Sequence, residues 1–352
     1  MNLLLHHADL ITRCRKRGDV ETTAVEAIHR CLDARRTELH KVFMQSGDVL
    51  VGLSAEIEAA GAVMSHDDGF SWPERTGSIE SNPHLQVCFG SDAPLIETLA
   101  TGEAHLTLML RTQLHEPYGF LVIVRATPPT AAELDIAQGI AVLLKNALAL
   151  LEYGETDTLT RLLNRKTFDE YLMNILANIP KSDQARSENP DHPQRRQNHP
   201  QERGHWLAVM DIDHFKSIND RFGHLIGDEV LILMSDLMRE SFRVQDKLFR
   251  FGGEEFVALL RPAELAHAKR AFDRFRARVE SHVFPQVGNV TISIGFARIG
   301  LGDTPALVLD SADEALYWAK EHGRNQCHAY ETLLETGQLK RPVETVSEIE
   351  LF

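Results

Sequence analysis

The chain has 352 residues, of which 43% are hydrophobic and 7% aromatic, a composition ordinary for a globular protein long enough to form two domains. Its formal net charge of -14 disfavours nonspecific binding to nucleic acid or to anionic lipid. The first residues do not follow the order of a signal peptide and no apolar run is expected to span a bilayer, so the sequence predicts a cytoplasmic protein without membrane insertion.

Residues 1–130 predict a compact module that mixes helices and strands. They begin with helical periodicity, continue through short segments separated by glycines, and end in the apolar strand YGFLVIVRATPP. The alternation is too irregular for a repeat array. Cys88 and His105 stand alone in this region, and isolated residues of these types do not predict a haem or metal site.

A long helix is predicted over residues 131–156. Thr130 and Glu133 have the spacing of a capping box at its start, and apolar residues recur over many turns. Two roles fit this pattern. The helix either pairs with a copy of itself and transmits a twist or register change, or packs on its own domain.

From Asp157 onward, strands and helices alternate. HWLAVMDID predicts a buried strand, NVTISIGFARI a second strand, and the segments 225–242, 262–282 and 306–323 amphipathic helices. With a hairpin between the first two helices, the order is βαββαβ with additions, which predicts an α+β fold of ferredoxin-like, palm-type arrangement. Residues 178–204 are rich in Pro, Gln, Asn and charge and predict a mobile insertion, and 333–352 predict a tail.

The segment RFGGEEF, residues 250–256, predicts a β-hairpin with acids at its tip. Gly252 and Gly253 suit the positive φ of a tight turn. Glu254 and Glu255 place adjacent like charges at the mouth of a strand, which is costly without a nearby cation. Asp211, at the end of a buried strand, has the same need. A Mg²⁺ ion between Asp211 and Glu254 would meet it, and solvated strand ends are the alternative.

Cations and amides complete a candidate nucleotide site. Lys320 and Arg324 are four residues apart near a predicted helix end, so their charges could converge on one anion. With Lys216 behind the strand end, they suggest a triphosphate. Asn219 and Asp228 offer an amide and a carboxylate suited to guanine. Surface charges that complement helix dipoles are the alternative for the cations.

Four ordered motifs carry a resemblance to a known family. RFGGEEF, TDTLTRLLNR, DIDHFKSINDRFGHLIGD and ADEALYWAKEHGRN together resemble the GGDEF family of diguanylate cyclases, in the GGEEF variant, over residues 157–332. The resemblance implies condensation of two GTP into cyclic di-GMP and two pyrophosphates, with one GTP on each of two facing domains and hence a homodimer. The alternatives are a catalytically silent receptor of GTP or cyclic di-GMP, and a palm-type nucleotidyl transferase or cyclase.

The resemblance also implies a role for each candidate residue. Glu255 would bind a second ion or help to deprotonate the attacking 3′-hydroxyl. The metal, Mg²⁺ or Mn²⁺, would be held by Asp211, the Ile212 carbonyl and Glu254; the backbone at Gly252 and Gly253 would approach the nucleotide; Phe215, Lys216, Lys320 and Arg324 would bind the phosphates; and Asn219 and Asp228 would read guanine.

RVQD, from Arg243 to Asp246, lies five residues before the signature, where the family has its product-inhibition site. RCLD at 30–33 and RAFD at 270–273 share the spelling, so the position carries the interpretation. The resemblance implies that Arg243 and Asp246 bind cyclic di-GMP as an inhibitor.

The layout of the front half is similar to a GAF sensory domain. It consists of a final strand, a proline turn and a long helix leading into TDTLTRLLNR. A PAS domain is the alternative. The resemblance implies regulation by a small-molecule or protein signal, which the sequence does not identify.

Overall fold

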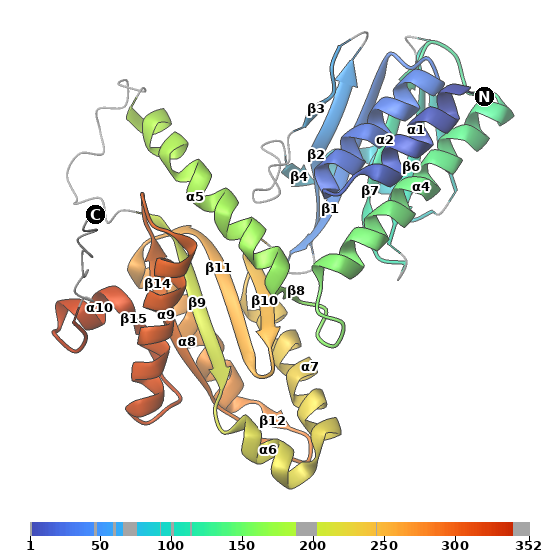
Figure 1. Cartoon of the computed structure of the whole chain (residues 1–352). Helices are drawn as coiled ribbons and strands as arrows, with labels where there is room; N and C mark the ends of the chain where they lie inside the picture. Colours follow the sequence, from blue (N-terminus) through green and yellow to red (C-terminus); the bar gives the residue numbers. More distant parts are fainter. Residues whose placement is uncertain are drawn as a thin grey trace, which may run out of the picture. The chain divides into compact units, whose positions relative to one another are not determined.

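The computed structural model divides the chain into two compact units, Met1–Glu155 and Thr156–Phe352 (Figure 1). It describes residues 2–340 except 46–47, 59–60, 66–75, 92, 100–101, 113–114, 188–202 and 244. Each unit has its own main sheet and hydrophobic core. The division falls at the end of the long helix that the sequence predicts.

The amino-terminal unit is an antiparallel sheet with helices on both faces. Its main strands lie in the order β2 (Asp48–Glu58), β1 (Arg36–Gln45), β7 (Pro117–Arg125), β6 (Ala104–Arg111) and β5 (Leu95–Thr98). The short strands β3 (Met64–Ser65) and β4 (Thr76–Ser78) pair with β2. The core on one face includes α1 (Asn2–Arg13), α2 (Arg17–Cys31) and α4 (Ala131–Glu155), and the core on the other includes η1 (Ile79–Ser81) and α3 (Pro83–Phe89).

The helix α4 packs on its own unit. Ala137, Ile140, Leu144 and Leu148 are buried in the core shared with α1 and α2. These residues recur every three to four positions, so they form one face of the helix. By length and composition α4 could also cross a membrane, so the expectation that no run is long enough to do so is wrong.

The start of α4 is fixed by the predicted capping box. The Thr130 backbone N–H donates to Oε2 of Glu133 at 2.8 Å, and the Glu133 N–H donates to Oγ1 of Thr130 at 3.3 Å. The other carboxylate oxygen of Glu133 pairs with Arg125 at the end of β7, 2.5 Å away. The capping box is confirmed, and Arg125 adds a charge partner that the local spacing does not reveal.

The carboxy-terminal unit has the predicted α+β arrangement. Its sheet order is β15 (Cys327–Ala329), β14 (Ile292–Ile299), β9 (Gly204–Ile212), β11 (Glu255–Ala263), β10 (Lys247–Gly252) and β8 (Leu163–Asn164). The four long strands thus lie in the ferredoxin-like order, with the first between the fourth and the third. The helices are α5 (Arg165–Ser187), α6 (Phe215–Phe222), α7 (His224–Ser241), α8 (Leu265–Ser281), α9 (Pro305–Glu321) and α10 (Tyr330–Glu335), and β12 (Val283–Phe284) and β13 (Gly288–Asn289) form a small hairpin.

Two predicted boundaries differ from the structure. The insertion expected at 178–204 begins inside α5, which continues to Ser187, and ends in β9, which starts at Gly204. Its middle, 188–202, lies outside the described residues. The tail expected from residue 333 begins inside α10, because Leu333 is buried and anchors that helix.

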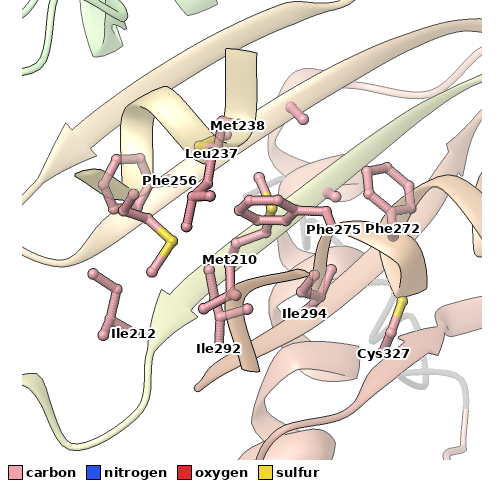
Figure 2. Packing of buried hydrophobic residues seen from close by; sticks show 14 of the residues in the cluster. Met210, Ile212, Leu237, Met238, Phe256, Phe272, Phe275, Ile292, Ile294 and Cys327 are labelled. Atoms are coloured by element: carbon pink, nitrogen blue, oxygen red, sulfur yellow. The ribbon is translucent and has the colours of Figure 1, made fainter. Parts of the chain in front are cut away.

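One face of the carboxy-terminal sheet is covered by α7 and α8. Figure 2 shows Met210 and Ile212 of β9 and Phe256 of β11 among side chains of both helices, including Leu237 and Phe275. The opposite face of the sheet receives α9, which contacts β14 and β9. Asp211 and Asp213, at the end of β9, are themselves buried, so their charges need partners within the protein.

Candidate functional site

The hairpin between β10 and β11 brings two acids to the end of β9, where Asp211 is the third. Glu255 is the strand partner of Asp211, and Glu254 accepts a hydrogen bond through its carbonyl from the Ile212 N–H at 3.4 Å. The turn has the expected positive φ, 146° at Gly252 and 52° at Gly253. A side chain at either glycine would be strained in this conformation. The meeting of the two acidic segments that the sequence predicts is therefore confirmed.

Asp211 is a buried carboxylate that pairs with a lysine. It is 8% exposed, and Nζ of Lys320 lies 2.8 Å from its Oδ2. Burial raises the pKa of Asp211; Lys320 opposes this rise, and the charges of Glu254 and Glu255 add to it. A carboxylate in this environment gains from additional positive charge.

Lys320 reaches Asp211 because α9 lies directly on β14. A Cβ atom at Gly295 of β14 would lie 2.0 Å from the backbone nitrogen of Leu316 and 2.2 Å from the carbonyl oxygen of Ala312. Only glycine permits this approach of helix to strand. Burial, followed by the charge of Glu255, raises the pKa of Asp313 on the same helix. Asp313 was not predicted as a site residue, although it lies within the ADEALYWAKEHGRN motif.

Asp213, two residues beyond Asp211, has a different role. Thr291 and Ser293 each donate a hydroxyl hydrogen bond of 2.7 Å to its carboxylate, and the Asn325 backbone N–H donates one of 3.0 Å. Asp213 is 5% exposed. Its hydrogen bonds fix the end of β9 against β14 and the turn that follows α9, so it positions the site rather than offering a free ligand.

Asn219 and Asp228, the predicted guanine readers, lie on the consecutive helices α6 and α7. A Cβ atom at Gly227 would lie 2.0 Å from Oδ1 of Asn219, so the amide rests against the backbone of α7 next to Asp228. Asp228 is exposed. Gly227 was not predicted as a site residue, and its only sequence signal is its place in the LIGD segment.

The predicted phosphate contacts differ in availability. Phe215 is buried, so its side chain serves the core and only its backbone can face a nucleotide. Lys216 and Arg324 are exposed and form no ion pair with a described residue. The helical spacing assumed between Lys320 and Arg324 is wrong, because α9 ends at Glu321 and Gly323 turns the chain with φ of 113°.

Arg250 ties the hairpin tip to the start of the unit. Its Nε and Nη2 donate to the Gly253 carbonyl at 3.2 and 2.9 Å, and its Nη1 donates to Oδ1 of Asp157 at 3.0 Å. Burial raises the pKa of Asp157, but hydrogen bonds from Thr160 and Arg250 outweigh burial and lower it. Arg250 lies in the RFGGEEF motif and Asp157 in the TDTLTRLLNR motif, yet neither was predicted as a site residue.

The RVQD segment forms a turn held by its own acid. Asp246 accepts hydrogen bonds from the backbone N–H of Arg243 at 3.0 Å and of Arg261 at 3.3 Å. Burial raises the pKa of Asp246, while those two N–H groups oppose the rise. The Arg243 residue is exposed. Arg243 is therefore accessible to solvent, whereas the Asp246 carboxylate already accepts two backbone hydrogen bonds.

The donor set at the end of β9 suits a hard cation. Within the described ranges, no group of three or more His, Cys, Asp or Glu side chains is arranged to hold a metal ion. Asp211, Glu254 and the Ile212 carbonyl offer oxygen atoms only. Mg²⁺ usually takes one or two carboxylates and completes its shell with water and substrate phosphates, so the residues fit this ion.

Comparison with known proteins identifies the domain that carries the site. Residues 191–326 match the family described as diguanylate cyclase, GGDEF domain. The chain is 42% identical over 123 residues to diguanylate cyclase DgcP of Pseudomonas aeruginosa, covering 34% of this chain and 18% of that protein. It is 46% identical over 123 residues to response regulator PleD of Caulobacter vibrioides, covering 33% of this chain and 27% of that protein.

A solved structure of the GGDEF domain of DgcB from Caulobacter crescentus in complex with c-di-GMP is 30% identical, with a TM-score of 0.44; the match covers 51% of this chain and 94% of that chain. The matched stretch spans 18% and 27% of the two curated relatives, well under two thirds of either. The carboxy-terminal unit contains a GGDEF domain.

Proposed function

We propose that the chain is a diguanylate cyclase, which condenses two GTP into cyclic di-GMP and releases two pyrophosphates. The observation that carries this proposal is the pairing of Asp211 with Glu255 in the strand register and with Lys320 of α9 through an ion pair, inside a GGDEF domain. Acids beside a lysine at the open end of a buried strand suit a metal ion bound to a triphosphate.

Asp211, Glu254 and the Ile212 carbonyl would hold Mg²⁺ or Mn²⁺. When bound, the ion supplies positive charge that neutralises the phosphates. The arriving triphosphate gives Lys320 a second anion and so competes with Asp211 for its ammonium group. Lys216 and Arg324, both exposed, add two cations for the same phosphates.

Each 3′-hydroxyl attacks the α-phosphate of the other GTP; one P–O bond forms and the bond to pyrophosphate breaks. Glu255 is exposed at the start of β11, where it can accept the hydroxyl proton. The backbone at Gly252 and Gly253 leaves room for the nucleotide, since neither glycine has a neighbouring atom where a Cβ would stand. Asn219 and Asp228 bind guanine through its amide edge.

Two GTP-loaded domains must face each other, so the active form is a homodimer. Three large apolar residues of α4 support pairing through this helix: Val142 is 55%, Leu150 76% and Tyr153 71% exposed. Their spacing places them on one side of the helix, away from the buried Leu144 and Leu148. A second copy of α4 would cover this stripe.

The amino-terminal unit acts as a GAF-like sensory domain, and its α4 leads directly into the GGDEF domain. Product inhibition would use the RVQD turn. The exposed Arg243 can fork onto guanine or phosphate of cyclic di-GMP, and Asp246 keeps lone pairs for a guanine donor. In an Arg243→Ala variant, added cyclic di-GMP should no longer slow turnover, whereas unchanged sensitivity would remove this role.

The activity is tested by incubating purified protein with GTP and Mg²⁺ and identifying the products by chromatography and mass. Glu254→Gln removes a ligand charge with little change of shape and should abolish product. Glu229→Gln removes an exposed charge of α7 and should leave it intact. If cyclic di-GMP fails to form after bound product is stripped from the wild type, yet GTP still binds, the chain is a silent receptor instead.

A further inference from the structure

A buried charged cluster in the amino-terminal unit has no part in the roles described above. Its centre is Glu21 of α2, which is 1% exposed. Ser54 of β2 donates a hydrogen bond of 2.9 Å to one carboxylate oxygen of Glu21. Nζ of Lys41 of β1 lies 2.9 Å from the other oxygen, to which the Tyr118 hydroxyl of β7 also donates. Three strands therefore contact one carboxylate of α2, which satisfies a charge that would otherwise be costly to bury.

The cluster continues from Glu21 to the last residue of α4. Burial and then the charge of Glu21 raise the pKa of Tyr118, whereas Arg17 opposes the rise through its charge and a hydrogen bond. Arg17 begins α2 one helical turn before Glu21, so the two side chains share a side of the helix. Nη2 of Arg17 donates to Oε2 of Glu155 at 2.9 Å. Tyr118 and Arg17 thus connect the buried acid to the end of α4.

The position of Glu155 in the chain gives this connection its importance. Glu155 ends α4, and Asp157, two residues later, is held by Arg250 within the GGDEF unit. One residue, Thr156, separates a residue fixed in one unit from a residue fixed in the other. Loss of the Arg17 contact would remove the side-chain support at the last turn of α4, where helix ends are least stable.

We propose that this cluster regulates the link to the GGDEF unit by holding or releasing the last turn of α4. While Tyr118 contacts both Glu21 and Arg17, the guanidinium is held in place for Glu155. A shift of β7 against α2 that separates Tyr118 from Glu21 removes this support, and the helix end loosens. The regulatory consequence rests on the cyclase function proposed above, whereas the holding of the helix end does not.

Hydrogen–deuterium exchange of the purified full-length chain tests the holding of α4 without requiring turnover. Tyr118→Phe removes one hydroxyl and keeps the ring, so amides of residues 151–155 should exchange about two- to tenfold faster. Amides at the start of α4, next to Thr130, should not change, which separates a local effect from a general loss of stability. Tyr317→Phe is the matched control, because its exposed hydroxyl donates to Glu321 at 2.6 Å on α9.

A double variant tests the route from Tyr118 to the helix end. Glu155→Gln removes the charge that Arg17 binds and should itself speed exchange of the last turn. In this background, Tyr118→Phe should add no further effect, because it acts through Arg17 on Glu155. Circular dichroism confirms that each variant is folded. Should Tyr118→Phe not fold, Glu21→Gln weakens the same hydrogen bond without deleting a group and serves the same comparison.

Three results of the exchange experiment would each overturn the proposal: wild-type exchange in Tyr118→Phe, equal acceleration along the whole of α4, or additive effects in the double variant. Where the wild type forms cyclic di-GMP, turnover in Tyr118→Phe should fall by about twofold or more, because a loosened helix end orients the two GTP-loaded domains less well. Wild-type turnover together with faster exchange would remove the regulatory role. A wild type that forms no cyclic di-GMP contradicts the cyclase function alone, and the exchange comparison still decides whether the cluster holds α4.

Discussion

Replacing Gly227 by alanine should weaken GTP binding while leaving the carboxy-terminal unit nearly as stable as before. The new Cβ would lie 2.0 Å from Oδ1 and 3.1 Å from Cγ of Asn219, and 3.3 Å from Cζ of Phe215. Asn219 can relieve the first two contacts by rotating its side chain. Alanine also gains about 1 kcal/mol over glycine inside a helix, which offsets the remaining crowding.

The displaced amide would lose the hydrogen bond to guanine that we propose for Asn219. One such bond contributes about 0.5–1.5 kcal/mol, so the dissociation constant for GTP should rise by up to about tenfold. Calorimetry with a nonhydrolysable GTP analogue measures this change, and urea unfolding measures stability. Gly139→Ala in α4 is the control: no atom lies within 4 Å of its Cβ position, so it should leave GTP binding unchanged.

A double variant isolates the cause. In an Asn219→Ala background, Gly227→Ala should not weaken GTP binding further, because its main steric partner is gone. Additive losses in the double variant, or an unchanged affinity in Gly227→Ala alone, would show that Gly227 does not act by positioning the Asn219 amide.

Two further substitutions test one side-chain contact in each unit. Arg250→Lys keeps the charge but loses the guanidinium fork that joins the Gly253 carbonyl to Asp157. The free energy of unfolding, measured with urea, should fall by about 1–3 kcal/mol, and GTP turnover should be reduced. Wild-type values of both quantities would exclude a role for this contact. Hydrogen bonds from Arg125 and then Thr130 lower the pKa of Glu133 to about 2 from an ordinary 4.5, so its stabilising contribution is complete above the ordinary pKa and is lost as the pH falls towards 2. The melting temperature of Glu133→Gln should therefore fall less than that of the wild type between about pH 6 and pH 3, and parallel curves would contradict this assignment.

The sequence predicts the acidic end of β9 well because local rules determine it. A buried apolar strand ending in acids and a glycine hairpin ending in acids each have a recognisable pattern, and the strand order then places Asp211 beside Glu255. The capping box of α4 is similarly local, since both partners lie within one helical turn.

Contacts between distant segments were not predictable in this way. The roles of Gly227 and Gly295 depend on how closely a neighbouring helix or strand approaches, which no local spacing encodes. Arg324 was misplaced because a helical spacing was extended past Gly323, where the chain turns. The contact of Arg17 with Glu155, 138 residues later in the chain, is likewise not encoded by any local spacing.

Asp213 has a consequence for the order in which the domain folds. Its hydrogen-bond donors Thr291, Ser293 and Asn325 lie 78, 80 and 112 residues later in the chain. Contacts of such long range require closure of large loops and form slowly relative to local turns. During synthesis, the end of β9 emerges long before these donors, so Asp213 lacks them until the Asn325 segment leaves the ribosome. The geometry at the end of β9 should therefore be completed only late in folding.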